Sequence, residues 1–340
     1  MSVVESPVTD SLEGIIVRLE AAVRRRFGGD ASIVNVDVAT LGASNRTLLF
    51  DLLDGNTTRR LVLRQETYRS PVSPFLSPHD QYRIHQVVHS HGLAIPEPIF
   101  ELDETDDLDR GFVVACIDGE TLPKTLLGDP AFASARSCFA TQSGEFFARL
   151  HAIPVAELPF LADSADSIDP LNAQRQRYDS YQESHPGIEV GLRWLENNRP
   201  QERAPKLIHG DYRVGNLLLN HQGITGVLDW ECAHQGNAME DIGWLCLRSW
   251  RFGRIDKPVG GMGPRSELYA AYSANGGETV DPEEVRWWEI FASLKWAILN
   301  IMQADGHVRG ERRSLPFACC GRNAAMIEYD MLMTISGRFQ

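Results

Sequence analysis

The chain has 340 residues, of which 43% are hydrophobic and 23% are charged. This composition is typical of a globular enzyme, and the length exceeds what one hydrophobic core normally serves, so we expect two lobes with a site between them. The net charge of −13 would repel a phosphate backbone, and no basic run is longer than Arg24, Arg25 and Arg26. We therefore expect no nucleic-acid partner.

Targeting signals and cysteine content indicate the cellular compartment in which we expect the protein. Residues 1–10 lack the basic and apolar regions of a secretory signal. The most apolar late stretch, residues 290–302, is interrupted by Lys295 and Asn300 and is too short to cross a bilayer, so it predicts a core helix. Six cysteines show no metal-ligand spacing and are too few for a disulfide-rich fold. We expect a cytoplasmic protein with reduced thiols and no membrane partner.

The first part of the chain mixes one helical pattern with several strand patterns. Apolar residues recur at helical spacing over residues 9–27, and Asp10 with Glu13 forms a candidate N-terminal cap. Valines alternate with polar residues over residues 34–38, which predicts a strand. Strands are also expected at residues 48–53 and 60–64, on either side of the turn signal Asp54-Gly55-Asn56, and at residues 111–117, with a helix at residues 79–91.

From about residue 122 the pattern is mainly helical. Helices are expected over residues 143–151, 174–184, 188–197 and 283–304. The exception is residues 207–229, where short apolar runs around glycine and asparagine predict strands joined by tight loops. The sequence therefore predicts an α+β protein, with a small antiparallel sheet lobe over residues 1–115 and a large, mainly helical lobe over residues 116–340.

The most informative stretch is His209-Gly210-Asp211-Tyr212-Arg213-Val214-Gly215-Asn216, which Asp229 follows thirteen residues later. Phosphoryl transfer needs a carboxylate that orients and deprotonates the attacking hydroxyl group, and oxygen ligands that hold Mg²⁺ on the phosphates. Asp211, Asn216 and Asp229 supply that set, at the spacing that the kinase catalytic loop uses. The alternative interpretation is an incidental polar turn followed by a strand.

This stretch resembles the aminoglycoside phosphotransferase and choline kinase-like family, whose signature is a His-Gly-Asp-x4-Asn loop followed by a strand ending in Asp-Trp-Glu or Asp-Phe-Glu. The resemblance spans about residues 41–304 and implies a two-lobed, protein-kinase-like fold that uses ATP and Mg²⁺, with a catalytic loop at residues 207–231. It implies that Asp211 is catalytic and that Asn216 and Asp229 bind the metal. It also implies supporting roles for His209, Glu231 and Asp241. The alternative interpretation for each of them is a purely structural role.

The nucleotide side of the resemblance lies in the first lobe. The family covers the ATP phosphates with a loop, which implies binding by Gly42, Ser44 and Asn45. The strand that carries the phosphate-pairing lysine in kinases ends here in Arg64, which can grip phosphate bidentately or be a surface residue. Gln81 falls near the glutamate that usually pairs with that lysine. The hinge position implies that backbone groups near Ala115 and Ile117 meet adenine.

The acceptor is the least defined part of the function. A polycationic aminoglycoside needs a pocket lined with carboxylates, yet residues 245–340, which with residues 155–205 should form the acceptor wall, hold 12 basic and 11 acidic side chains. Arg251 and Arg254 lie near Trp250 and could contact an anionic acceptor, or they could belong to a solvated helix end. The segment around Trp250 also resembles a branch of the family linked to acyl-CoA dehydrogenases.

Three hypotheses follow from these residues. The first is a kinase that phosphorylates a hydroxyl group of a small metabolite, with a hydroxyacyl-CoA favoured as acceptor. The second is an aminoglycoside phosphotransferase. The third is a catalytically silent nucleotide-binding protein, prompted by Arg64 and Gln81. The presence of Asp211, Asn216 and Asp229 together argues against the third, because binding alone does not need all three.

Overall fold

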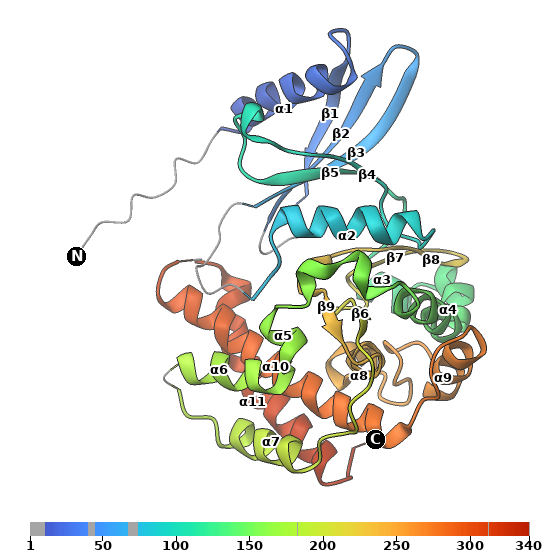
Figure 1. The fold of residues 1–340 in the computed structure, drawn as a ribbon, viewed down its shortest axis with the longest axis vertical. Coiled ribbons are helices and arrows are strands. Elements are labelled where there is room, and N and C mark those ends of the chain that lie inside the picture. The colour runs from blue at the N-terminus through green and yellow to red at the C-terminus, as the bar shows by residue number, and fades with distance from the viewer. Residues whose placement is uncertain (1–10, 40–44, 67–73, 182, 312, 340) are drawn as a thin grey trace. The chain divides into compact units, whose positions relative to one another are not determined.

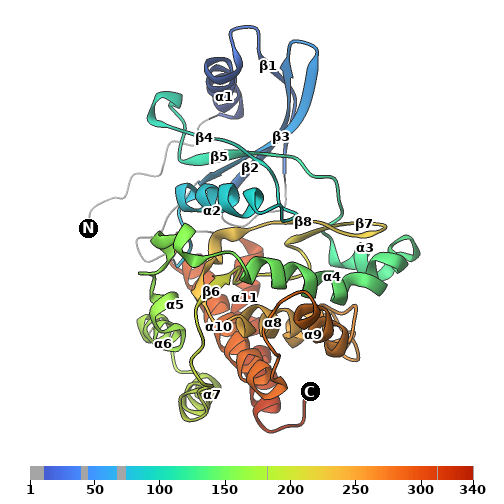
Figure 2. The same ribbon diagram turned by 45° about the vertical axis from the view of Figure 1, so that its right-hand side comes forward.

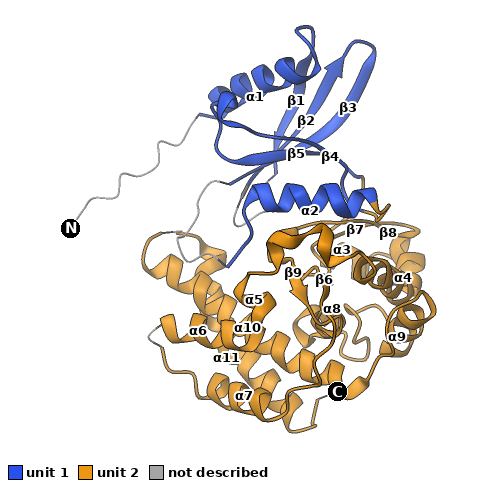
Figure 3. Ribbon diagram, viewed as in Figure 1, with its two compact units in different colours: residues 1–90, 95–117 blue, residues 91–94, 118–340 orange. Residues whose placement is uncertain are grey.

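The computed structural model describes residues 11–39, 45–66, 74–181, 183–311 and 313–339. The chain divides into two compact units (Figure 3). Unit 1 holds residues 1–90 and 95–117, and unit 2 holds residues 91–94 and 118–340. The boundary expected after residue 115 lies close to this division.

Unit 1 is an antiparallel sheet with two helices (Figure 1). Its strands run in the order β1-β2-β3-β5-β4, and each neighbouring pair is antiparallel. The elements are α1 (Leu12–Phe27), β1 (Ser32–Val38), β2 (Asn45–Asp54), β3 (Thr57–Glu66), α2 (Pro78–Ser90), β4 (Pro98–Glu101) and β5 (Gly111–Ala115). The apolar face of α1 (Ile15, Leu19 and Val23) packs into one core with the strands (Leu48, Phe50, Leu61, Leu63 and Val113).

Three details of unit 1 differ from the sequence-based expectations. Helix α1 is capped by Ser11, whose hydroxyl accepts from the Gly14 N–H at 3.2 Å; Asp10, which was expected to form the cap with Glu13, lies outside the described residues. In β1 the residue that enters the core is Ile33, whereas Val34 and Val38 are exposed. The cause is a register shift between Val34 and Asp37, because Asn35 has a positive φ and interrupts the alternation of side chains between the two faces of the sheet. Strand β4 was not expected, because prolines flank it; it lies at the sheet edge, where proline is tolerated.

Unit 2 is mainly helical and also carries two small ladders, β6 with β9 and β7 with β8. Its helices of six or more residues are α3 (Pro123–Gly128), α4 (Ala133–His151), α6 (Pro170–Ser180), α7 (Pro186–Asn197), α8 (Met239–Cys246), α9 (Arg265–Ala274), α10 (Pro282–Val308) and α11 (Leu315–Ile335), and a single turn forms α5 (Ala165–Ile168). Its strands are β6 (Lys206–Ile208), β7 (Leu217–Asn220), β8 (Gly223–Val227) and β9 (His234–Gly236).

The helices predicted in unit 2 are all present, although several bounds differ. Helix α4 begins earlier than the predicted residue 143, and α6 overlaps the predicted span 174–184 but begins and ends earlier, at Pro170 and Ser180. No predicted span covers α3, α5, α8, α9 or α11. All eight residues of α8 are buried, so this helix has no polar face and no amphipathic period to reveal it.

The strands of unit 2 bracket the motif that the sequence singled out. Strand β6 ends just before His209, β7 begins just after Asn216, and β8 ends just before Asp229. Helices α10 and α11 lie side by side, and α8 packs on α10 (Figure 2). In the part of the chain that the structure describes, no helix is both long and apolar enough to cross a membrane.

Candidate active site

Gly210 gives the catalytic loop its backbone path. Its φ is +76°, and a Cβ at this position would collide with the carbonyl oxygen of Cys232. Only glycine combines that close approach with a positive φ at little cost. The chain therefore turns sharply at the end of β6, and the next residue is Asp211.

The Asp211 carboxylate is held by three side-chain donors. Its Oδ1 accepts from Arg213 Nε at 3.0 Å and from Trp244 Nε1 at 3.1 Å. Its Oδ2 accepts from Asn216 Nδ2 at 2.6 Å. Trp244 comes from α8, so a helix that follows the loop by some thirty residues fixes one carboxylate oxygen. These contacts lock the rotamer of the proposed base.

Charge and burial act on Asp211 in opposite directions. Burial raises the pKa of its carboxyl group above the ordinary value, the Arg213 guanidinium lowers it, and the nearby Asp229 carboxylate raises it again. The net effect is a raised pKa. The side chain is still 17% exposed, so it can reach a ligand. A carboxylate that is buried on one side, accessible on the other and more basic than usual suits proton abstraction.

Asn216 and Asp229 are brought together by the β7–β8 hairpin. The Leu228 N–H donates to the Asn216 carbonyl oxygen at 2.8 Å, which places Asp229 beside this asparagine. The Asn216 amide nitrogen donates to the Asp211 main-chain oxygen at 3.0 Å as well as to the Asp211 carboxylate. The Asn216 amide and the Asp229 carboxylate carry hard oxygen atoms of the kind that Mg²⁺ prefers, so these two residues are the candidates for a metal pair.

Asp241, on α8, anchors the backbone of the catalytic loop. Its Oδ2 accepts from the His209 N–H and its Oδ1 from the Gly210 N–H, both at 2.9 Å. His151 lies 3.3 Å from the same carboxylate. Burial alone would raise the pKa of Asp241, but the contact with His151 and the two amides hold it below the ordinary value. The carboxylate touches the loop and faces the interior, so the structure places it as a brace.

His209 is buried within the loop. Its Nδ1 accepts from the Asp211 N–H at 3.2 Å, and its Nε2 lies 3.0 Å from the Leu228 carbonyl oxygen, to which it must donate. Burial lowers the pKa of this imidazole, consistent with the neutral form that these partners require. Glu231 lies in the half-buried turn Trp230–Cys232 that follows Asp229. His209 thus links the loop to the end of β8.

Arg213 and the tryptophans around it were not identified from the sequence. The Arg213 guanidinium lies 4.9 Å from the ring centroid of Trp250, and Trp250 packs with Trp244 and Trp296. The only sequence signal was the position of Arg213 inside the motif, two residues after Asp211. The structure therefore adds a cation and an aromatic cluster to one side of the base.

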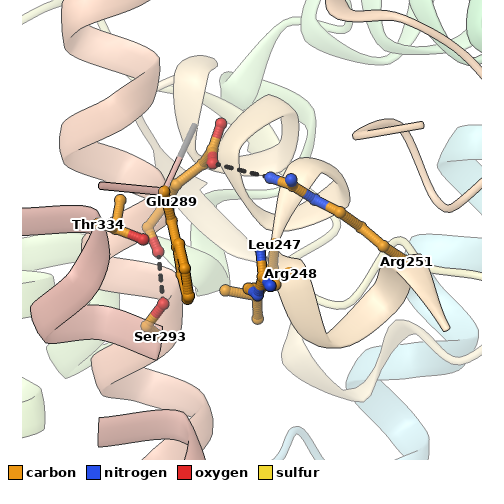
Figure 4. Close-up of a pocket in the computed structure, with 7 residues that line it drawn as sticks. Leu247, Arg248, Arg251, Glu289, Ser293 and Thr334 are labelled. Carbon is orange, nitrogen blue, oxygen red and sulfur yellow. Dashed lines mark hydrogen bonds and ion pairs between the residues drawn. The ribbon is translucent and has the colours of Figure 1, made fainter. Parts of the chain in front are cut away.

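The expectation that Arg251 contacts an acceptor is not supported by its surroundings. Arg251 is 2% exposed, its Nη2 donates to the Cys246 carbonyl oxygen at 2.9 Å, and it lies 3.6 Å from the Glu289 carboxylate. It lines a small cavity with Leu247, Arg248, Glu289, Ser293, Thr334 and Phe339 (Figure 4). The Arg251 guanidinium is paired within the interior of unit 2, because a buried charge needs a partner there. Arg254 is exposed, and one of its nitrogens donates to the Leu127 carbonyl oxygen.

The residues expected to bind nucleotide lie in unit 1. Gly42 and Ser44 lie outside the described residues, and Asn45 begins β2 opposite Glu66. Arg64 is half-buried on β3 between Thr47 and Phe112 of the neighbouring strands. In the helix that follows, the Gln81 amide nitrogen donates to the Leu76 carbonyl oxygen at 3.0 Å.

The hinge expectation needs one correction. The Ala115 N–H already donates to the Glu97 carbonyl oxygen at 2.8 Å, because β5 pairs with β4 on that side. It is therefore not a free donor for adenine. Ile117 is half-buried and follows Cys116, whose N–H donates to the Arg60 carbonyl oxygen at 2.9 Å. Its backbone remains the hinge group to test.

Comparisons with known proteins place these features in a wider group. The model of a family described as "Phosphotransferase enzyme family" matches residues 37–288. Mouse acyl-CoA dehydrogenase family member 10 is 24% identical over 217 residues, which are 61% of this chain and 20% of that protein. The chain thus spans about a fifth of this curated relative.

Two solved structures share the fold. A Ralstonia eutropha protein provisionally described as an aminoglycoside phosphotransferase has a TM-score of 0.72 and 20% identity, and the match covers 94% of this chain and 98% of that one. An aminoglycoside phosphotransferase variant solved with AMP-PNP and hygromycin B has a TM-score of 0.63 and 15% identity, with 94% and 97% covered. At this level of identity the likeness concerns the fold, and both neighbours have the two-lobed kinase-like plan expected from the sequence.

Proposed function

Because this chain belongs to the phosphotransferase enzyme family, we propose that it transfers the γ-phosphoryl group of ATP to a hydroxyl group of a small molecule. The observation that carries the proposal is the geometry of Asp211, a carboxylate fixed by Trp244, Arg213 and Asn216 and still accessible. A catalytically silent protein would have no use for a base held in one rotamer at a raised pKa.

The role of each residue follows from its position. Asp211 accepts a hydrogen bond from the acceptor hydroxyl group and takes its proton as the oxygen attacks phosphorus. Asn216 and Asp229 present oxygen atoms that would hold Mg²⁺, which when bound neutralises charge on the phosphates. Asp241 and His209 keep the loop in place. Arg64, on β3 of unit 1, is the candidate contact for the phosphates.

The surroundings of the base favour a neutral or anionic acceptor over a polycation. Arg213 places a positive charge within hydrogen-bond distance of the Asp211 carboxylate, where an aminoglycoside would have to bring amino groups. The near-neutral charge of residues 245–340 points the same way. Within this class a hydroxyacyl-CoA is our first choice, because the curated relative carries an acyl-CoA dehydrogenase name. An aminoglycoside acceptor is the second candidate, supported by the solved neighbour with hygromycin B.

The test is an acceptor screen with the purified chain. ATP consumption with Mg²⁺ would be measured against hydroxyacyl-CoA esters, aminoglycosides, choline-like alcohols and sugars, and mass spectrometry would identify the phosphorylated product. We expect turnover with a neutral or anionic hydroxyl compound that disappears in Asp211→Asn. Turnover on aminoglycosides alone would favour the second candidate. ATP binding without transfer to any acceptor would leave the silent protein as the correct hypothesis.

A further inference from the structure

A cluster of buried charges in unit 2 has no part in the mechanism above. It consists of His234 on β9, Glu240 on α8 and Lys295 on α10, which are 2%, 3% and 5% exposed. Lys295 Nζ lies 3.2 Å from Glu240 Oε1, and Glu240 Oε2 lies 3.0 Å from His234 Nε2. Buried ions cost free energy to desolvate, and a hydrophobic set of the same volume would often be no less stable. Stability alone is therefore a poor reason for the cluster.

The protonation of the cluster follows from its partners. His234 Nδ1 lies 3.0 Å from the Cys232 carbonyl oxygen and its Nε2 faces the Glu240 carboxylate, so both ring nitrogens meet acceptors. Both nitrogens must then donate, which makes this imidazole a cation. Burial alone would lower the pKa of His234, but Glu240 raises it above the ordinary value. His234 and Lys295 thus both pair with Glu240, and the Asp166 carboxylate also raises the pKa of each of these two cations.

The Lys295 ammonium group lies 5.2 Å from the ring centroid of Trp244, and it has a further partner that belongs to the catalytic loop. Lys295 Nζ lies 3.3 Å from the carbonyl oxygen of Gly210, which is part of the peptide bond leading to Asp211. The N–H of the same glycine is bound by Asp241 at 2.9 Å. Buried ions of opposite sign, from α10 and α8, therefore hold the two polar backbone groups of Gly210. A hydrogen bond from a cation is roughly twice as strong as a neutral one.

We propose that Lys295 is a positioning residue for phosphoryl transfer: its ammonium group fixes the Gly210–Asp211 peptide plane and so aims the Asp211 carboxylate. The Glu240–His234 pair holds the ammonium group at the required place. Lys295 does not touch the reacting atoms and acts only through the loop. The catalytic side of this inference rests on the proposed function, whereas the anchoring of the loop does not.

The chain provides a matched control for a purely structural ion pair. Arg265 pairs with Glu289, which lies on the same helix as Lys295, at 2.7 Å, and Glu289 is 7% exposed. Arg265→Met thus removes a cation from a buried carboxylate of α10 whose ion-pair partners, among the described residues, are Arg265 and Arg251 and not residues of the catalytic loop. A loss of activity through general destabilisation would appear in both variants.

The kinetic test compares Lys295→Met, Lys295→Arg and Arg265→Met, each assayed well below its own melting temperature. Methionine keeps the length of the side chain and leaves the His234–Glu240 pair intact. We expect Lys295→Met to lower kcat by about 10- to 100-fold, with the KM for ATP and the calorimetric affinity for Mg-ATP changed less than about twofold. Lys295→Arg should recover most of kcat, and Arg265→Met should keep it. Equal losses of kcat in Lys295→Met and Arg265→Met would overturn the proposal.

A second readout is independent of any acceptor. Hydrogen exchange of the backbone amides of residues 209–216 should be faster in Lys295→Met than in wild type, and unchanged in Arg265→Met. Unchanged exchange in Lys295→Met would refute the anchor even if the protein is a verified kinase. A wild-type protein that phosphorylates nothing would refute the proposed function, while the exchange data would still decide the anchor. If Lys295→Met does not fold, Lys295→Gln takes its place with the same outcomes.

Discussion

The catalytic loop of unit 2 and the nucleotide-side strands of unit 1 are built in different ways. In the loop, side chains from α8 and α10 bind both the backbone and the functional carboxylate. Asp241 accepts from the Gly210 N–H, and Trp244 donates to the Asp211 carboxylate. On the strands, the backbone is held by the sheet ladder, and Arg64 is placed by its register between Thr47 and Phe112. A loop needs side-chain anchors for accuracy, whereas a strand receives its accuracy from its neighbours.

This difference predicts where single substitutions have the largest effect. In the loop segment a change to one side chain should alter turnover or, at the proposed metal pair, metal-dependent binding. On the strands a change should weaken ATP affinity more mildly and leave turnover nearly intact. The four predictions below test this contrast, from the largest expected effect to the smallest.

Asp211→Asn should lower kcat by about 10²- to 10⁴-fold while Mg-ATP binding survives. Asparagine keeps the size and one acceptor oxygen, but it cannot take the hydroxyl proton. The measurement is steady-state turnover on the acceptor found in the screen, with thermal melts in the presence and absence of Mg-ATP. A variant as fast as wild type would remove Asp211 from the mechanism, and a lost nucleotide-induced shift would indicate a damaged loop.

Asp229→Ala should abolish Mg²⁺-dependent ATP binding, because it removes the carboxylate of the proposed metal pair. The check is calorimetric titration of ATP with Mg²⁺ and with EDTA. Wild type should bind at least about tenfold more tightly with the metal, and the variant should bind equally under both conditions. Metal-dependent affinity that persists in the variant would show that the ligand lies elsewhere.

Arg64→Ala should raise the KM for ATP by about tenfold and leave the KM for the acceptor nearly unchanged, since one charge-assisted phosphate contact is lost. Arg59→Ala is the matched control, because Arg59 lies on the same strand and pairs with Glu97 on the surface at 3.0 Å. If the two variants have the same ATP kinetics, Arg64 is a surface residue of the sheet.

Arg213→Met should move the acid limb of the kcat/KM profile to higher pH. Asp211 must be ionised to act as a base, and Arg213 lowers the pKa of its carboxyl group. Removing the guanidinium therefore raises that pKa, and activity is lost at a higher pH as the solution is acidified. Arg199→Met, which removes a surface pair with Asp169, serves as the control. An acid limb at the same pH in both variants would show that Arg213 does not act on the base.

The sequence identified candidate catalytic residues because their spacing is local. Asp211, Asn216 and Asp229 lie within one strand-loop-strand segment, so their chemistry is visible in a short motif. The fold class was predicted for a related reason, since amphipathic helices and paired strands leave periodic patterns. The comparisons confirm the kinase-like fold and the phosphotransferase family.

The partners of these residues could not be predicted from spacing. Trp244 meets Asp211 only because α8 packs beside the loop, and α8 is buried on every side, so no pattern marked it. Lys295 was visible as one charge inside an apolar helix, which indicates a buried partner without identifying it. For Arg251 the sequence suggested a role that its surroundings do not support. Its position near aromatic residues suggested an anion site, but the side chain is buried.

The anchoring of Gly210 also has a consequence for the order in which the protein folds. The loop is synthesised before α8, which carries Asp241, and 85 residues before Lys295. Contacts between distant segments form late, because their loop-closure entropy must be offset first. A growing chain that has already made Asp211, Asn216 and Asp229 therefore lacks the groups that shape the loop. Full activity should arise only when α10 docks, so a nascent or truncated chain would not hydrolyse ATP to any useful extent.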